Sequence, residues 1–230
     1  MFTRFLIGGA CAALFIMSAS VSANSVFITE FCSDTGNNEK FEFVEFTNVG
    51  NTPINMTGWS EDDSNATPNK AGHSLSAFGT LAPGESGIFT EALPSAFKSY
   101  WGSALPPALK VIGPYTTDNL STTSDSITLF DSTGTLVDRL DYSTSNGGSA
   151  DMITRNAPLN ALGKNNNSLW VNSHVGDKFG SFRAAQKIVI VGNPGLYPVP
   201  EPSSIVLAGF GLLGVLLVAR RRYRTSSSRP

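Results

Sequence analysis

The chain has 230 residues, with 18 acidic and 16 basic side chains, and its mean hydropathy is 0.00. The charges are unevenly spread: residues 24–198 hold seventeen acidic and ten basic residues, a net charge of about −7, and most other basic residues are arginines near the C-terminus. This negative charge argues against nucleic acid as a partner, because it repels phosphate backbones. A region of this size suits one all-β domain.

Residues 1–23 have the pattern of a secretory signal peptide. One arginine precedes the apolar residues 5–17, and small residues lead up to Ala23. We expect cleavage between Ala23 and Asn24. A lipoprotein attached through Cys11 is the weaker alternative, because the apolar run continues past this cysteine.

Short stretches rich in β-branched and aromatic residues, each bounded by Gly, Pro, Asn, Asp or Ser, predict strands. They are residues 26–31, 41–47, 54–59, 87–90, 126–131, 136–142 and 187–191. This pattern predicts a β-sandwich. Residues 41–46 are apolar on both faces, which indicates a central strand covered on each side. One short helix is expected over 95–101, with Gly102 as its stop.

The clearest hairpin surrounds residues 131–134. Asp131 and Gly134 suit the first and fourth positions of a type I turn. The alternation of the return strand predicts that Leu136, Leu140 and Tyr142 share one face.

The strongest candidate for metal binding is the acidic stretch after residue 60. Asp62, Asp63 and Asn65 would offer the oxygen ligands that calcium prefers. Their spacing is not that of the calcium-loop signature, so a solvated acidic loop is the favoured interpretation. Calcium remains the weaker alternative.

Few side chains are available for catalysis. The only histidines are His73 and His174, which excludes a three-histidine zinc site, and the common hydrolase and phosphate-binding motifs are missing from the sequence. We therefore predict no catalytic residues, no cofactor and no enzyme. The alternative is a membrane-tethered hydrolase that uses loop carboxylates or a histidine.

Three polar or reactive side chains within predicted strands have expected structural roles. Cys32 is the only cysteine left after signal removal, so it cannot form an internal disulfide and should be a small buried residue. Glu45 and Asp138 are expected to accept hydrogen bonds from backbone or loop amides.

The C-terminus consists of three short segments. Residues 198–202 are proline-rich, residues 203–219 form an uncharged apolar run, and residues 220–230 begin with Arg220, Arg221 and Arg222. As a helix the apolar run spans about 25 Å, close to the roughly 30 Å hydrocarbon core of a bilayer. We predict a transmembrane helix whose arginines stay in the cytoplasm, with the preceding chain outside.

The order of these segments resembles the PEP-CTERM sorting signals of exported bacterial proteins. Pro200, Glu201 and Pro202 form the triplet, and the apolar span and the arginine cluster follow it. The two prolines favour an extended, accessible peptide. The resemblance implies recognition by an exosortase-type sorting enzyme in the membrane, followed by anchoring or by release to the cell surface.

A second resemblance covers residues 24–197. The segments 26–31, 43–48 and 54–59, followed by Leu81-Ala82-Pro83-Gly84, residues 125–129 and Asn193-Pro194-Gly195, are similar to a lamin-tail domain. The resemblance implies an immunoglobulin-like sandwich that serves structural or adhesive binding, with exopolysaccharide or an envelope protein as ligand. Residues 61–75 and 151–185 match loosely, and extra strands or a binding surface are expected there.

Overall fold

Two packed sheets form the centre of the computed structural model, which describes residues 25–33, 40–63, 65–115, 119–143, 152–186 and 190–199. All of these residues belong to one compact unit, Ser22–Glu201, which we term the head. The predicted cleavage site at Ala23 and Asn24, the triplet Pro200-Glu201-Pro202, the span 203–219 and the cluster Arg220-Arg221-Arg222 lie outside the described residues.

The main sheet has six strands in the order β11-β10-β1-β2-β6-β7, and a second sheet has the order β4-β8-β9. All neighbouring pairs in both sheets are antiparallel except β6 and β7. The strands of the main sheet are β1 (Val26–Cys32), β2 (Phe43–Asn48), β6 (Ser86–Thr90), β7 (Lys110–Ile112), β10 (Arg155–Asn156) and β11 (Val171–Asn172). Those of the second sheet are β4 (Ser60–Asp62), β8 (Ser124–Phe130) and β9 (Leu136–Ser143).

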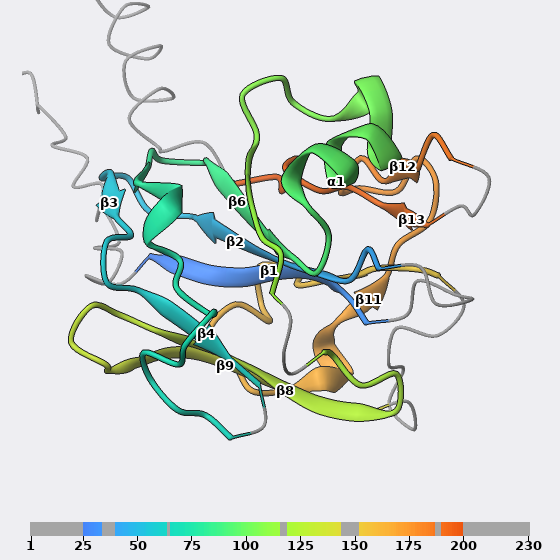
Figure 1. The fold of residues 1–230 in the computed structure, drawn as a ribbon. Helices are drawn as coiled ribbons and strands as arrows, with labels where there is room; N and C mark the ends of the chain where they lie inside the picture. Colours follow the sequence, from blue (N-terminus) through green and yellow to red (C-terminus); the bar gives the residue numbers. More distant parts are fainter. Residues whose placement is uncertain are drawn as a thin grey trace, which may run out of the picture. The chain divides into compact units, whose positions relative to one another are not determined.

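Smaller elements form a third layer and one short ribbon. The helix α1 (Pro94–Trp101) and the pair β12 (Phe182–Arg183) and β13 (Val191–Gly192) lie on the face of the main sheet opposite to β8 and β9 (Figure 1). The strands β3 (Ile54–Asn55) and β5 (Thr80–Leu81) pair separately. The predicted all-β sandwich is confirmed.

Two apolar cores lie on opposite faces of the main sheet. The inner core, between the two sheets, includes Ile28, Phe31, Val44, Phe46, Trp59, Ile127, Leu140, Tyr142 and Trp170. The outer core, beneath α1, includes Cys32, Phe43, Ile88, Phe97, Tyr100, Trp101, Leu105 and Ile190. Strand β2 contributes Phe43 to one core and Val44 and Phe46 to the other, as its pattern predicted. Cys32 is buried at the end of its strand, also as expected.

The helix α1 follows the predicted signals. It begins with Pro94 at its first position, where the missing N–H costs no hydrogen bond. It ends at Gly102, whose φ of +77° favours glycine. Its buried side chains Phe97, Tyr100 and Trp101 all enter the outer core.

The predicted hairpin is present, with one error at its return strand. The amide of Gly134 donates to the Asp131 carbonyl at 3.0 Å, which closes the turn. A bulge then sets both Leu136 and Val137 against Phe130, so Val137 packs on the inner core and Leu136 is 48% exposed. The prediction that Leu136 shares the face of Leu140 and Tyr142 is wrong because alternation fails at a bulge.

The predicted strand 54–59 is also only partly correct. Residues 54 and 55 form β3, but Trp59 N then donates to the Met56 carbonyl at 3.0 Å, and Gly58 between them has a φ of +81°. This turn directs the chain into β4 in the other sheet. Of the predicted strand 187–191, residues 187–189 are not described, and Val191 begins β13.

Asp138 joins the two sheets at the β1–β9 side of the sandwich. Its Oδ2 accepts the amide of Ile28 at 2.9 Å, across 110 residues of sequence. The expected role of this carboxylate, to accept a backbone amide, is confirmed. This bond links β9, the edge strand of its sheet, to β1 of the main sheet.

Candidate functional site

The acidic stretch after residue 60 is buried, not solvated. Glu61 and Asp62 lie on β4, between β8 and the segment around His73, and their side chains are 4% and 0% exposed. Lys70 Nζ lies 2.8 Å from Asp62 Oδ1, and Thr67 N donates to Asp62 Oδ2 at 2.6 Å. The expectation of a solvated loop is wrong because β4 pairs with β8 and residues 67–73 cover it, which buries both side chains.

Electrostatics in this cluster follow from its ion pairs. Burial raises the pKa of Asp62, but hydrogen bonds from Lys70 and Thr67 outweigh it, so the pKa is lowered overall. Burial raises the pKa of Glu61, and His73 partly offsets this effect. His73 Nδ1 lies 2.9 Å from Glu61 Oε2, so the two side chains satisfy each other.

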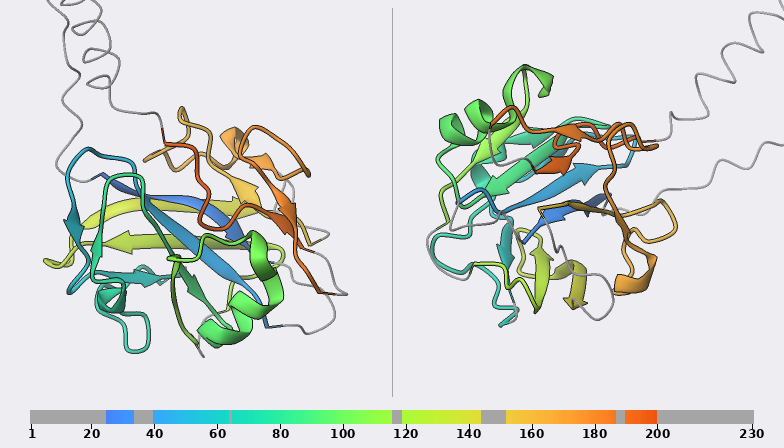
Figure 2. Two further views of the ribbon diagram at one scale, coloured as in Figure 1. Left: turned by 90° about the horizontal axis from the view of Figure 1, so that it is seen from above. Right: turned by 90° about the vertical axis from the view of Figure 1, so that its right-hand side faces the viewer.

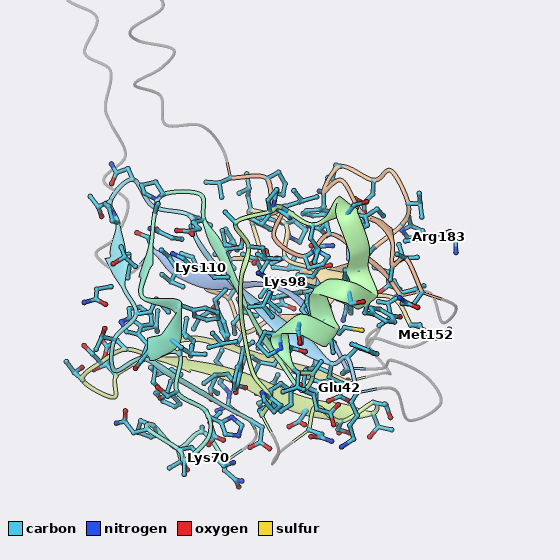
Figure 3. All side chains as sticks on the ribbon, turned by 45° about the horizontal axis from the view of Figure 1, so that its top comes forward. Glu42, Lys70, Lys98, Lys110, Met152 and Arg183 are labelled. Atoms are coloured by element: carbon cyan, nitrogen blue, oxygen red, sulfur yellow. The ribbon has the colours of Figure 1, made fainter. Side chains whose placement is uncertain are left out.

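The calcium site stays a prediction, and it would require Lys70 to leave Asp62. Asp63 also lies within 3.7 Å of Lys70, while Asn65 is exposed and its amide bonds to Asp63. Within the described ranges, no group of three or more His, Cys, Asp or Glu side chains is placed to hold a metal ion. Lys70 stands at the rim of the head, away from Lys98 on α1 (Figure 3).

The two histidines differ in accessibility. His174 is exposed, whereas His73 is 1% exposed and its ring contacts the rings of Phe89 and Tyr115. Both lie in loops, but only His174 is open to solvent. A histidine enclosed in this way does not meet a substrate.

A second buried acidic pair lies on the outer face of the main sheet. Glu30 of β1 and Glu45 of β2 are directly paired across the two strands, and both are 0% exposed. Glu45 Oε1 accepts the hydroxyls of Thr29 at 2.9 Å, Thr47 at 3.1 Å and Ser86 at 3.1 Å. This anion is therefore well supplied with donors.

The backbone that covers this pair comes from residues 190–199, which we term the C-terminal segment. Gly195 N donates to Glu45 Oε2 at 2.5 Å, and Asn193 N donates to Glu30 Oε1 at 2.9 Å. The expected role of Glu45, to accept a loop amide, is confirmed. Figure 2 shows this segment, in orange-red, on the face of the main sheet opposite to β8 and β9.

Further contacts hold the C-terminal segment along its length. Ile190 is fully buried in the outer core, and Thr154 N donates to the Val191 carbonyl at 2.9 Å. Gly192 approaches so closely that a Cβ there would lie 2.6 Å from Glu30 Oε1. Near the end of the segment, the buried Tyr197 donates its hydroxyl to the Ala157 carbonyl at 2.6 Å. The segment is thus an integral part of the head.

Glu30 has fewer donors than Glu45. Its Oε1 accepts Asn193 N and the hydroxyl of Thr154, but its Oε2 has no hydrogen-bond partner among the described residues. Burial and then the neighbouring charge of Glu45 raise the pKa of Glu30 well above its usual value. Burial also raises the pKa of Glu45, against the lowering effect of its donors. The pair is therefore poised to retain a proton.

The described head defines a class of protein: an immunoglobulin-like all-β sandwich whose C-terminal segment is packed on its main sheet. The Lamin Tail Domain family matches residues 19–144, more than half of the chain, so the protein belongs to this family. A PEP-CTERM protein-sorting motif matches residues 198–222. No curated protein matches the chain.

These matches indicate an exported envelope protein that an exosortase sorts through its C-terminus. Neither matched family is an enzyme family, which favours a non-enzymatic role. The lamin tail match ends just after β9, although β10, β11 and the C-terminal segment complete the main sheet and its cover. Among the described residues no helix is long and apolar enough to cross a membrane, and the predicted span 203–219 lies outside those residues.

Proposed function

We propose that this is a non-enzymatic envelope protein that displays a lamin-tail head for structural or adhesive binding, with exopolysaccharide or another envelope protein as ligand. The signal peptide 1–23 directs export, and the span 203–219 holds the chain in the membrane. Arg220, Arg221 and Arg222 remain in the cytoplasm. An exosortase then recognises Pro200, Glu201 and Pro202.

One observation carries this proposal: the matched sorting motif begins at residue 198, immediately after Tyr197. Tyr197 is a buried residue of the C-terminal segment and is bonded to Ala157. A cut at or beyond the triplet would therefore leave every described contact of the head intact. Processing at this position separates a folded head from its membrane span without unfolding it.

The construction of the head supports a binding role rather than catalysis. Its acidic residues Glu30, Glu45, Glu61 and Asp62 are buried and bonded to other parts of the head. The acidic net charge of about −7 over residues 24–198 keeps such a protein soluble outside the cell. A rigid, soluble sandwich is suited to present its loops to a large ligand.

The sorting step is tested by changing Pro200, Glu201 and Pro202 together to alanine in the full-length protein in its native host. We expect an uncleaved precursor to accumulate in the membrane and the processed product to fall at least about tenfold, because the extended recognition peptide is lost. Immunoblots of fractionated cells against the head provide the measurement.

The matched control changes Ser226, Ser227 and Ser228 to alanine, three positions beyond both the arginine cluster and the matched motif. This control should be processed like the wild type. If the triplet variant also keeps normal processing and location, sorting is wrong and simple anchoring remains.

A further inference from the structure

We propose that Glu30 is a neutral carboxylic acid whose proton, donated to Asn156 Oδ1, latches the C-terminal segment onto the head. The latch is a property of the head itself. Only its consequence, that the latch fixes the chain leading into the sorting motif, rests on the proposed function.

The register places the two groups of the latch together. Glu30 on β1 and Asn156 on β10 are directly paired, so their side chains leave the same face of the sheet as neighbours. Glu30 Oε2 and Asn156 Oδ1 are both buried acceptors without a partner among the described residues. The register makes the two side chains neighbours, and two acceptors can bond to each other only if one of them carries a proton.

A chain of hydrogen bonds fixes the orientation of the Asn156 amide. Asn156 Nδ2 donates to Ser173 Oγ at 2.7 Å, Ser173 lies 2.6 Å from Thr154 Oγ1, and Thr154 donates to Glu30 Oε1. Three contacts need three protons, and the two hydroxyls supply only two of them. The third must come from the amide N–H, so Nδ2 faces Ser173 and Oδ1 is left as the acceptor.

The surrounding charges place the proton on Glu30. The charge of Glu45 on β2 and, more weakly, that of Asp177 from the loop before β12 repel a charge on Glu30, and burial together with the charge of Glu45 raises the pKa of Tyr197. Glu45 accepts the amide of Gly195 and lies beside three hydroxyls, a richer set of donors than that of Glu30, so it is the better placed of the two to hold the negative charge. Arg155 supplies no counter-charge, because its guanidinium bonds to Asn167 and to the Trp170 carbonyl.

The third layer also contributes Tyr100 of α1, whose hydroxyl accepts the amide of Ile190 at 3.3 Å. It anchors the start of the C-terminal segment. Beyond these residues, the cover over Glu30 is the backbone of Gly192 and Asn193. Ionised Glu30 could reach water only if this backbone lifted.

The sign of the pH dependence follows from burial. The pKa of Glu30 in the closed head lies above its unfolded value, so the closed form holds more protons. The latch is fully present below the unfolded pKa and is lost as the pH rises through the closed-state pKa. Between the unfolded and the closed-state pKa, each pH unit shifts the equilibrium about tenfold toward the open segment, and above the closed-state pKa the shift levels off.

The test is hydrogen exchange of the full-length protein in detergent, read at the amides of Asn193 and Gly195 and corrected for intrinsic exchange. In the wild type we expect protection to fall between pH 6 and pH 9, approaching about tenfold per pH unit. In Glu30→Gln the side-chain amide donates permanently to Asn156 Oδ1, so protection should no longer depend on pH.

Glu42→Gln is the matched control, since burial and the charge of Glu91 raise the pKa of Glu42 to about 8 while its carboxylate bonds to Leu120, outside the latch. It should leave the pH dependence at Asn193 and Gly195 as in the wild type. Equal wild-type protection at pH 6 and pH 9 would overturn the latch, as would an unaltered pH dependence in Glu30→Gln.

An infrared measurement keeps the proposal testable if Glu30→Gln folds poorly. The difference spectrum between wild type and the folded fraction of Glu30→Gln at neutral pH should contain the carbonyl band of a buried protonated carboxylic acid, because the band of Glu42, present in both proteins, cancels. Absence of this band from the difference spectrum would mean that Glu30 is ionised, with a bridging water in place of the proton. Neither result bears on the alanine test of the sorting triplet.

Discussion

Replacing Glu45 with alanine should lower the free energy of unfolding by about 4 kcal/mol, because the carboxylate is the common acceptor for four donors. A buried donor left without a partner costs about 1–3 kcal/mol, and the vacated space adds a cavity cost. The hydroxyls of Thr29, Thr47 and Ser86 also contact one another at 2.7 Å, which limits the loss. The amide of Gly195 has no such substitute.

Urea denaturation at neutral pH, monitored by tryptophan fluorescence, measures this loss of unfolding free energy. The control is Glu85→Ala, which removes a partly exposed carboxylate that pairs with Lys110 at 2.8 Å. Such a surface pair contributes about 1 kcal/mol or less. Equal losses for the two variants would show that Glu45 does not organise the cover of the main sheet.

Replacing Trp101 with alanine should cost about 4 kcal/mol, because its ring is 1% exposed and joins three elements. From its position on α1, the ring contacts Phe43 of β2 at a centroid distance of 6.0 Å and Phe182 of β12 at 5.5 Å. The cavity would therefore loosen the third layer from the main sheet.

The same urea titration tests this variant, with Trp59 and Trp170 left as fluorescent reporters. The control is Leu93→Ala, one residue before α1, where the side chain is 59% exposed and the cost should stay within about 0.5 kcal/mol. A loss below about 1 kcal/mol for Trp101→Ala would mean that the outer core is not part of the cooperative head.

Local patterns in the sequence predicted the elements that local chemistry determines. The strands β1, β2, β6, β8 and β9, the helix α1 and the hairpin at Asp131 all appear close to their expected bounds. The continuous apolar run around Phe43 also predicted a strand with a core on each face. In each case the residues that determine the element lie within the segment itself or in segments directly next to it in the fold.

The predictions were wrong where contacts with a segment distant in the sequence determine the structure. The acidic residues Glu61 and Asp62 look solvent-exposed by composition, but pairing with β8, across more than sixty residues, buries them. Their partners His73 and Lys70 follow in the next loop, a pairing that charge alternation could have suggested. Leu136 was misassigned because a bulge is not visible in strict alternation.

The contacts of the buried acidic pair Glu30 and Glu45 were also beyond prediction from local patterns, because their partners are distant in the sequence. Glu30 is bonded to Asn193 across 163 residues and Glu45 to Gly195 across 150. The sequence did contain one signal, on β2: Glu45 and Thr47 alternate with Val44 and Phe46 and so share the face of Phe43. A polar strand face in a protein whose fold covers both faces requires a polar cover, and Asn193-Pro194-Gly195 supplies it.

The residues matched by the family model end before the folded head does. Residues 19–144 contain both glutamates, but their cover comes from Thr154, Asn193 and Gly195 beyond it. A head that ended at residue 144 would expose this pair to water. The chain up to Tyr197 therefore belongs to the folded unit, and the sorting signal begins where that unit ends.

Intact-mass spectrometry of the protein recovered from the cell envelope and the culture medium tests the central claim most directly. The account predicts a mature chain that begins at Asn24, retains Tyr197 and lacks the arginine cluster at residues 220–222. A full-length chain from Met1 to Pro230, recovered from the cytosol as the main species, would contradict it.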